Sequence, residues 1–275
     1  MNTHTHVHAR GRTYVLYSLA ALVGLAACAH DGLTTPAPFD ATTWVGPRFL
    51  TTPETTTGAR PLLLLFALDA DTTLHGADTP RQPAYHTIAD PLVAQGWLIA
   101  SLDMPAHGED RRPGEPDNAL LAWAQRLQAG EPLVSTFTET VSALLNHLIA
   151  IGRVDPNRIA AAGISRGGFL ALHAAAADPR IRAVVGLSPV TDLRALAEFA
   201  ALQEDPYVGS LRLHEQTSLR ATAIWLAMAE DDTRVSTSSG AAFAAGVGAS
   251  WHTYPGTAHA VPVPLIVEGA AWLLR

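Results

Sequence analysis

The chain has 275 residues, of which 48% are hydrophobic and 16% are charged, so it can bury a substantial core and is not an intrinsically disordered protein. Its formal net charge is −7, all 18 basic residues are arginine, and no basic cluster stands out, so we expect no nucleic-acid partner. The single cysteine, Cys28, excludes an internal disulfide bond.

Residues 1–27 have the pattern of a secretory signal: a positively charged start, MNTHTHVHARGR, is followed by the apolar run TYVLYSLAALVGLAA. This run is shorter than the roughly 20 residues of a membrane-spanning helix. The sequence LAAC at 25–28 resembles the lipobox of bacterial lipoproteins, which implies lipidation of Cys28. The resemblance predicts a protein anchored to the membrane in the bacterial cell envelope, and Ala29 favours the outer membrane. An ordinary signal peptide or an uncleaved anchor is the alternative.

The segment that follows the cysteine has the composition of a linker. Residues 28–47 are rich in Pro, Thr and Gly and have no apolar period, so we expect a tether between the anchor and the folded body. No later change in composition marks a second boundary, which predicts a single domain over residues 48–275. The sequence does not indicate an oligomeric state.

Within residues 48–275, short apolar runs alternate with longer segments of helical spacing. The predicted strands cover 60–68, 97–103, 158–165, 181–189, 222–230 and 250–256. The predicted helices cover 85–96, 137–152, 167–177, 236–247 and 263–275, with two short helical insertions at 118–128 and 193–203. This alternation predicts an α/β fold with a doubly wound, mostly parallel sheet, in which active sites lie beyond the carboxyl ends of the strands.

The motif GISRG at 163–167 has the form G-x-S-x-G and lies between a predicted strand and a predicted helix. Its glycines allow a sharp turn that lifts the hydroxyl of Ser165 above the sheet. The following helix points its amino end at the site, which favours developing negative charge. The backbone N–H of Arg166 is the candidate for one oxyanion donor.

A serine hydroxyl becomes a good nucleophile only beside a base that a third group orients. In this sheet topology the acid and then the histidine follow the serine along the chain. Asp232 comes directly after the predicted strand 222–230, and His259 lies in a loop after the last predicted strand. These positions predict a catalytic triad of Ser165, Asp232 and His259.

Four segments together resemble the α/β-hydrolase superfamily, notably its dienelactone-hydrolase and prolyl-oligopeptidase-like esterase branches. The segments are GWLIASLDMPAHGE (96–109), DPNRIAAAGISRGGFLAL (155–172), AEDDTRV (229–235) and YPGTAHAV (254–261). The resemblance runs from about residue 60 to the end and implies the α/β-hydrolase fold. In the family's Asp-x-x-Val pattern the acid precedes the valine by three residues, which selects Asp232. Asp231 is the second choice, and Asp192 is less favoured.

The chain departs from this family after its third strand, where members carry His-Gly and a second oxyanion donor. Here the strand runs into FALDADTTLHGADTP (66–80), so that His75 and Gly76 come several residues late. By position, the second donor is the amide of Leu68, with Ala67 as the alternative.

The combined pattern predicts a serine hydrolase that cleaves a small-molecule carboxylic ester through an acyl-enzyme intermediate. No cofactor is implied, and no Cys/His cluster has the spacing of a metal site. Two alternatives stay open: a peptidase, amidase or thioesterase of the same fold, and a non-catalytic cell-envelope binding protein with a degenerate oxyanion hole. His107 is interpreted as orienting its own loop, with substrate contact as the alternative, and His173 as a packed helix residue.

Overall fold

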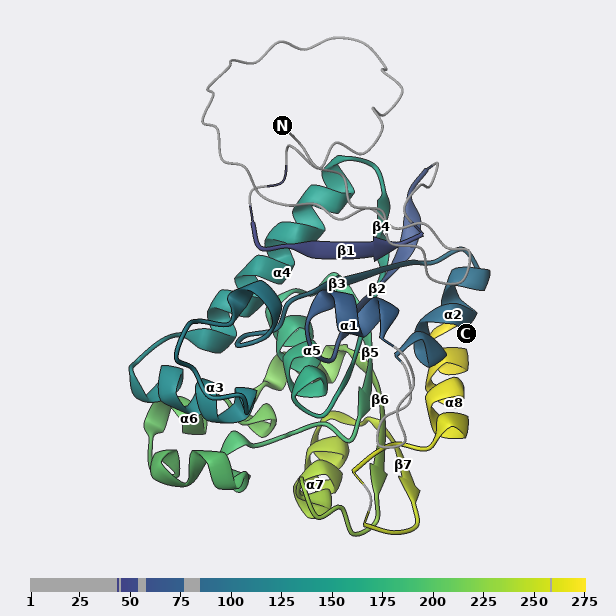
Figure 1. The fold of residues 1–275 in the computed structure, drawn as a ribbon. Helices are drawn as coiled ribbons and strands as arrows, with labels where there is room; N and C mark the ends of the chain where they lie inside the picture. Colours follow the sequence, from purple (N-terminus) through teal and green to yellow (C-terminus); the bar gives the residue numbers. More distant parts are fainter. Residues whose placement is uncertain (1–43, 45, 54–57, 77–84, 258) are drawn as a thin grey trace.

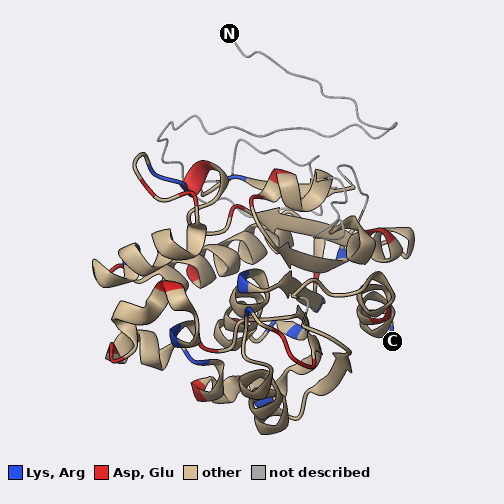
Figure 2. Ribbon diagram, turned by 60° about the horizontal axis from the view of Figure 1, so that its bottom comes forward, with Lys and Arg blue, Asp and Glu red and all other residues tan. Residues whose placement is uncertain are grey.

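The computed structural model describes residues 44, 46–53, 58–76, 85–257 and 259–275. The predicted signal segment, Cys28 and almost all of the predicted tether lie outside the described residues, so lipidation at Cys28 stays a prediction. Among the residues that are described, no helix combines the length and apolar character needed to cross a membrane. Acidic and basic residues are interspersed over the described elements (Figure 2).

The described residues form a seven-stranded sheet with the strand order β1-β3-β2-β4-β5-β6-β7 (Figure 1). The strands are β1 (Phe49–Thr52), β2 (Arg60–Phe66), β3 (Leu98–Leu102), β4 (Val154–Ile164), β5 (Ile181–Leu187), β6 (Ala223–Ala229) and β7 (Ser250–Tyr254). All neighbouring strands are parallel except β1, which pairs antiparallel with β3. The predicted doubly wound, mostly parallel fold is thereby confirmed.

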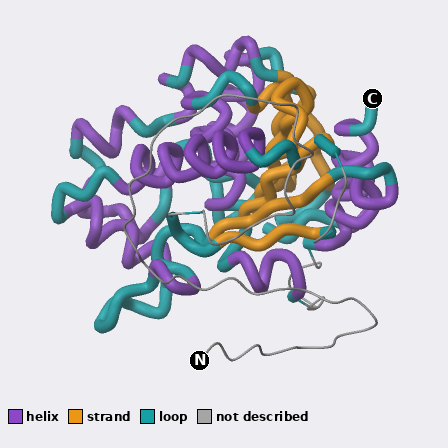
Figure 3. Tube along the Cα trace, turned by 90° about the horizontal axis from the view of Figure 1, so that it is seen from above, coloured by secondary structure: helices purple, strands orange, loops and turns teal. Residues whose placement is uncertain are grey.

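The helices cover both faces of this twisted sheet, which is seen from above in Figure 3. They are α1 (Ala70–His75), α2 (His86–Ala94), α3 (Ala119–Gln128), α4 (Leu133–Ala150), α5 (Arg166–Ala177), α6 (Pro206–Ser210), α7 (Thr237–Val247) and α8 (Val263–Leu273). Helices α3, α4, α5 and α7 contribute buried side chains to one core, and α1, α2 and α8 contribute to the core on the opposite face.

The apolar run of β2 explains why this strand is recognisable from the sequence. Leu62, Leu64 and Phe66 are buried in one core, whereas Leu63 and Leu65 are buried in the other. Successive side chains of a strand point to opposite faces, so a strand covered on both faces reads as an unbroken apolar run.

Several short elements differ from the prediction or were not predicted, among them the segment 193–203, strand β1 and helix α1. The segment 193–203 was expected to be one helix, but it forms two short 3₁₀ turns because Leu196 is extended, with φ −92° and ψ 141°, between them. Strand β1 and helix α1 were not predicted, since elements of four and six residues are too short to show a clear apolar period. Helix α1 begins at a local cap, in which the Asp69 side chain accepts a hydrogen bond from the Thr72 amide.

His173 lies within α5 as the sequence predicted, 5% exposed, with its ring 4.4 Å from that of Phe169 and its Nε2 2.9 Å from the Leu211 carbonyl. A carbonyl oxygen only accepts hydrogen bonds, so Nε2 carries a proton and donates it. Burial lowers the pKa of His173 to about 4, although the bond to Leu211 opposes that shift. The ring is therefore neutral in the folded protein near neutral pH.

We expect the free energy of unfolding to fall as the pH drops from about 6.5 to about 4. In that range the unfolded chain binds a proton at His173 that the folded chain does not bind, and the loss amounts to roughly 3 kcal/mol. The His173→Gln variant keeps an N–H donor without titrating, so urea unfolding should show a weaker pH dependence for it than for the parent. Equal pH dependence of the two proteins would contradict the assignment.

Candidate active site

Ser165 occupies a strained turn between the end of β4 and the start of α5. Its φ is 55° and its ψ is −118°, in the region that side-chain-bearing residues rarely adopt. The turn is held by the Ser165 amide, which donates to the Leu187 carbonyl at 2.9 Å. A Cβ atom on Gly167 would lie 2.0 Å from the Phe66 carbonyl oxygen, and one on Gly163 would lie 2.2 Å from the Gly167 carbonyl carbon. Close approach of backbone segments therefore requires both glycines.

The strand order places this turn at a crevice. In the sheet, β3 lies on one side of β2, whereas β4, β5, β6 and β7 follow in order on its other side, so the strand order reverses between β2 and β4. The carboxyl ends of β2 and β4 therefore flank a topological switch point, where open α/β sheets bind ligands. Ser165 follows β4, and Ala67 and Leu68 follow β2 at the same edge.

Asp232 and His259 are joined by a hydrogen bond of 2.9 Å between Oδ2 of the carboxylate and Nδ1 of the ring. Asp232 lies in the loop after β6, and its side chain is 0% exposed. Its Oδ1 accepts the amides of Arg234 at 2.7 Å and Val235 at 3.0 Å. Burial raises the pKa of Asp232, but the bonds from His259 and the two amides together bring it below the usual value.

The ionised carboxylate fixes the proton position on the His259 ring. Because an ionised carboxylate only accepts hydrogen bonds, Nδ1 must carry the proton, and Nε2 of the neutral ring is an acceptor. This Nε2 is buried and has no hydrogen-bond partner among the described residues. The pair thus presents a proton-accepting nitrogen on the side away from Asp232.

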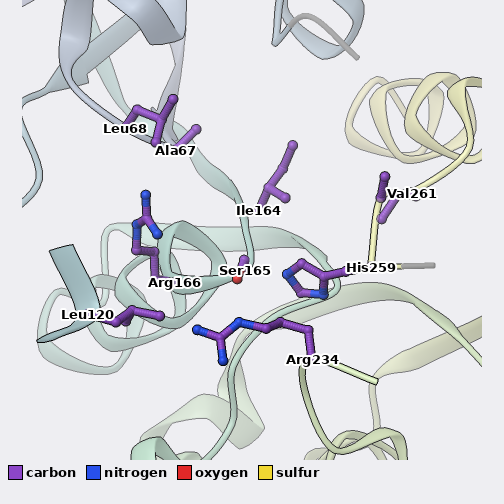
Figure 4. Close-up of a pocket in the computed structure, with 10 residues that line it drawn as sticks. Ala67, Leu68, Leu120, Ile164, Ser165, Arg166, Arg234, His259 and Val261 are labelled. Atoms are coloured by element: carbon purple, nitrogen blue, oxygen red, sulfur yellow. The ribbon is translucent and has the colours of Figure 1, made fainter. Parts of the chain in front are cut away.

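Ser165 and His259 line the same cavity, which has a volume of about 260 Å³. Its lining residues are Ala67, Leu68, Leu120, Ile164, Ser165, Arg166, Arg234, His259, Ala260 and Val261. Figure 4 shows the His259 ring beside Ser165, with one ring nitrogen turned toward the serine. No hydrogen bond joins these two side chains in the described part of the chain. Catalytic hydrogen bonds are commonly long in apo structures and shorten in the substrate complex.

The alternative acids are placed elsewhere. Asp192 forms an ion pair with Arg194 at 2.9 Å and caps the turn that begins at Leu193. The amide of Asp231 donates to the Gly256 carbonyl, and its side chain is not the one bonded to His259. The structure therefore brings Asp232, and neither of the two alternatives, to the histidine.

The two predicted oxyanion donors differ in their surroundings. The Arg166 amide is at the first position of α5, where helix amides lack partners within the helix. The Leu68 amide donates to the hydroxyl of Thr73 at 3.2 Å. An oxyanion could use the Leu68 amide only after this bond breaks. The choice between Leu68 and Ala67 thus stays a prediction, and both residues line the cavity.

Sequence reasoning missed two arginine side chains in the cavity. Arg234 forms a paired contact with Glu198, at 2.6 and 3.1 Å, and Arg166 contacts His107 at 2.9 Å. His107 also bonds to the Pro105 carbonyl at 2.9 Å, so it holds its own loop as predicted and contacts the site as well. Their positions in the sequence could have indicated that they lie in the site, because Arg166 directly follows Ser165 and Arg234 comes two residues after Asp232.

The sheet, the strained serine turn and the acid–histidine pair in the later loops define a protein of the α/β-hydrolase class. The profile of the prolyl oligopeptidase family matches residues 123–265, about half of the chain, and this stretch contains Ser165, Asp232 and His259. The chain belongs to the prolyl oligopeptidase family.

Individual relatives are distant. A Bacillus subtilis (strain 168) protein named as a hydrolase, YtaP, is 25% identical over 182 residues, which cover 62% of this chain and 58% of that protein. The α/β hydrolase ucsC of an Acremonium species is 33% identical over 126 residues, covering 44% of this chain and 23% of that protein. The chain thus spans less than two thirds of either relative.

Solved structures share the fold at low identity. Acetyl xylan esterase 1 from Thermoanaerobacterium sp. JW/SL YS485 superposes with a TM-score of 0.62 and 17% identity, covering 83% of this chain and 79% of that one. A cold-adapted esterase from an Arctic intertidal metagenomic library gives a TM-score of 0.58 and 21% identity, covering 82% and 86%. A puromycin-hydrolyzing peptidase of Mycobacterium tuberculosis gives 0.59 and 16%, covering 83% and 37%.

Proposed function

We propose that the protein is a serine hydrolase that cleaves small carboxylic esters. The observation that carries this proposal is the 2.9 Å bond from Asp232 to His259, a residue that lines the same cavity as Ser165. A buried, ionised acid that orients a histidine beside a serine in a strained turn is the arrangement that activates a hydroxyl nucleophile.

The proposed reaction has two halves. The Ser165 oxygen attacks the ester carbonyl carbon while Nε2 of His259 accepts the hydroxyl proton, and Asp232 stabilises the resulting imidazolium. The ester C–O bond then breaks, and His259 passes the proton to the departing alcohol. Water, deprotonated by His259, next attacks the acyl-enzyme carbonyl. The bond to the Ser165 oxygen breaks, His259 passes its proton to that oxygen, and the acid is released. The Arg166 amide and an amide of the 67–68 segment would stabilise the oxyanion in both halves.

The size of the cavity supports a small substrate, and the structural relatives support an ester. A cavity of about 260 Å³ lies just below the usual range of about 300–1,000 Å³ for ligand sites, which favours a small substrate. Acetyl xylan esterase 1 and the Arctic enzyme are named esterases and share this fold. Membership of the prolyl oligopeptidase family favours a second candidate, cleavage of a small amide or peptide by the same three residues.

A covalent probe tests the proposal. The full chain, purified in mild detergent, should gain the mass of one fluorophosphonate adduct and hydrolyse phenyl acetate, whereas Ser165→Ala should do neither. Phenyl acetate and acetanilide share an acyl group, so each kcat/KM is divided by the hydroxide-catalysed rate of that compound. A larger ratio for the ester supports an esterase, and a larger ratio for the anilide supports the amidase alternative. A folded parent without adduct or turnover would instead favour a non-catalytic binding protein.

A further inference from the structure

Two arginines line the cavity, but only one of them is neutralised by a carboxylate. Arg234 is held by both oxygens of Glu198, whose side chain is 11% exposed. Arg166 forms no ion pair with any carboxylate in the described part of the chain, and its one hydrogen-bond partner there is His107. No carboxylate therefore contacts the Arg166 guanidinium beside Ser165; Glu198, which is bonded to Arg234, acts on it only through space.

His107 orients the Arg166 guanidinium without cancelling its charge. Nδ1 of His107 is bonded to a carbonyl, which only accepts, so Nδ1 carries the proton. Nε2 must then be the acceptor for the Nη2–H of Arg166 at 2.9 Å. Burial lowers the pKa of His107, and the neighbouring Arg166 charge lowers it further, which keeps the ring neutral. Only one N–H of the guanidinium is used by this contact.

The two carboxylates that act on His107, Asp69 and Asp103, already accept hydrogen bonds from backbone amides. Asp69 caps α1 through the Thr72 amide at 2.8 Å, and Asp103 accepts the amides of Ala70 and Glu109, each at 2.8 Å. Meanwhile Nε of Arg166 is buried and has no partner among the described residues. A guanidinium keeps its proton even where burial lowers its pKa, so a buried, unpaired one favours an anionic partner.

We infer that the Arg166 guanidinium is a carboxylate-binding subsite, so that the preferred substrate is an ester whose acyl half carries a carboxylate, namely a half-ester of a short dicarboxylic acid. The planar fork of an arginine matches both oxygens of a carboxylate. This inference rests on the proposed function, because it defines the substrate class of the same site.

The positions of the side chains assign the carboxylate to the acyl half. In Figure 4 the Arg166 guanidinium points toward Leu68, on the side of Ser165 opposite to His259. The leaving alcohol must lie at His259, which gives it a proton. A carboxylate held by Arg166 therefore belongs to the part of the substrate that stays on Ser165.

Two matched pairs of phenyl esters test the inference, with the kcat/KM of each corrected for its hydroxide-catalysed rate. The acyl pair is monophenyl adipate and phenyl methyl adipate, and the alcohol pair is 4-acetoxybenzoate and its methyl ester. We expect monophenyl adipate to be preferred over its neutral partner by at least about tenfold, as for one charge-assisted hydrogen bond. The alcohol pair should show no preference for the anion.

Variants then locate the effect. In Arg166→Met the adipate preference should fall to about one, whereas Arg220→Met, which removes an exposed arginine outside the cavity, should keep it. Arg166→Gln takes the place of Arg166→Met if circular dichroism shows that the methionine substitution prevents folding. Equal turnover of both adipates by the parent, or a preference for 4-acetoxybenzoate instead, would overturn the inference while the proposed function stands.

Binding without turnover separates the two proposals. Monomethyl adipate, titrated calorimetrically into Ser165→Ala, should bind at least about tenfold more tightly than dimethyl adipate, and Arg166→Met added to this variant should remove the difference. If no ester is turned over and no adduct forms, the proposed function fails. In that case a difference in affinity between the two adipates still supports the carboxylate-binding subsite, and equal affinities overturn it.

Discussion

Replacing Ser165 with alanine should lower kcat for ester hydrolysis by roughly 10⁴–10⁶-fold, and His259→Ala should cost about as much. Both side chains take part in one proton transfer, so neither contributes much once the other is gone. The double variant should therefore be no slower than either single variant, as measured by phenyl acetate turnover at high enzyme concentration. The residual rate comes from the oxyanion donors and from substrate binding.

Two further variants, one at a control serine and one at Asp232, complete this experiment. Ser238→Ala removes an exposed hydroxyl of α7 outside the cavity and should retain the parent's rate. Asp232→Asn should also be slow, because an amide nitrogen facing Nδ1 favours the ring tautomer that protonates Nε2 and blocks the base. Losses for Ser165 and His259 that multiply in the double variant would show that the two residues act independently, contrary to the proposed mechanism.

The second large effect is expected at Gly167. An alanine Cβ here would lie 2.0 Å from the Phe66 carbonyl oxygen and 2.6 Å from its carbon, so α5 and the end of β2 must move apart. Overpacking against backbone costs about 1–3 kcal/mol of unfolding free energy or more. The same movement displaces Ser165 from the 67–68 segment, and a misplacement of about 1 Å costs about 10²-fold in turnover.

Gly246 provides the matched control for this substitution. A Cβ there would have no heavy atom within 4 Å, and the residue lies within α7. Gly246→Ala should therefore raise the free energy of unfolding by about 0.5–1 kcal/mol and leave turnover unchanged. Urea unfolding and phenyl acetate turnover of both variants check the pair. A Gly167→Ala protein that equals the parent in both measurements would show that the turn does not depend on the backbone contact.

Much of the fold could be predicted because its signals are local. The unbroken apolar run of β2 and the glycines around Ser165 reflect constraints within a few residues, and the helices that follow the strands have clear spacing. Strand β1 could not be predicted because a four-residue edge strand has little pattern. The two turns within 193–203 have the pattern of one helix because the break at Leu196 has no Gly or Pro signal.

In the candidate site, too, the features with local sequence signals could be predicted and those that depend on distant packing could not. Ser165, Asp232 and His259 could be proposed from motif and chain order, and the structure places the last two in contact. Neither the Leu68–Thr73 bond nor the charge state of the cavity could be predicted. Arg234 and Glu198 are separated by 36 residues, so which arginine is neutralised depends on how a distant insertion packs.

Arg234 links the loop of the proposed catalytic acid to the segments inserted after the strands. Its backbone amide donates to the carboxylate of Asp232, and its side chain donates to Glu198, which lies in the segment between β5 and β6. The side-chain amide of Asn118, in the other insertion, also donates to the carboxylate of Glu198. Exchanging the segment that carries Glu198 would release a second positive charge into the cavity and loosen the loop of the acid, and exchanging the insertion of Asn118 would remove a hydrogen bond that positions Glu198. Specificity and chemical rate would then change together, so a library that varies the insertions alone should keep Glu198 and Asn118 constant.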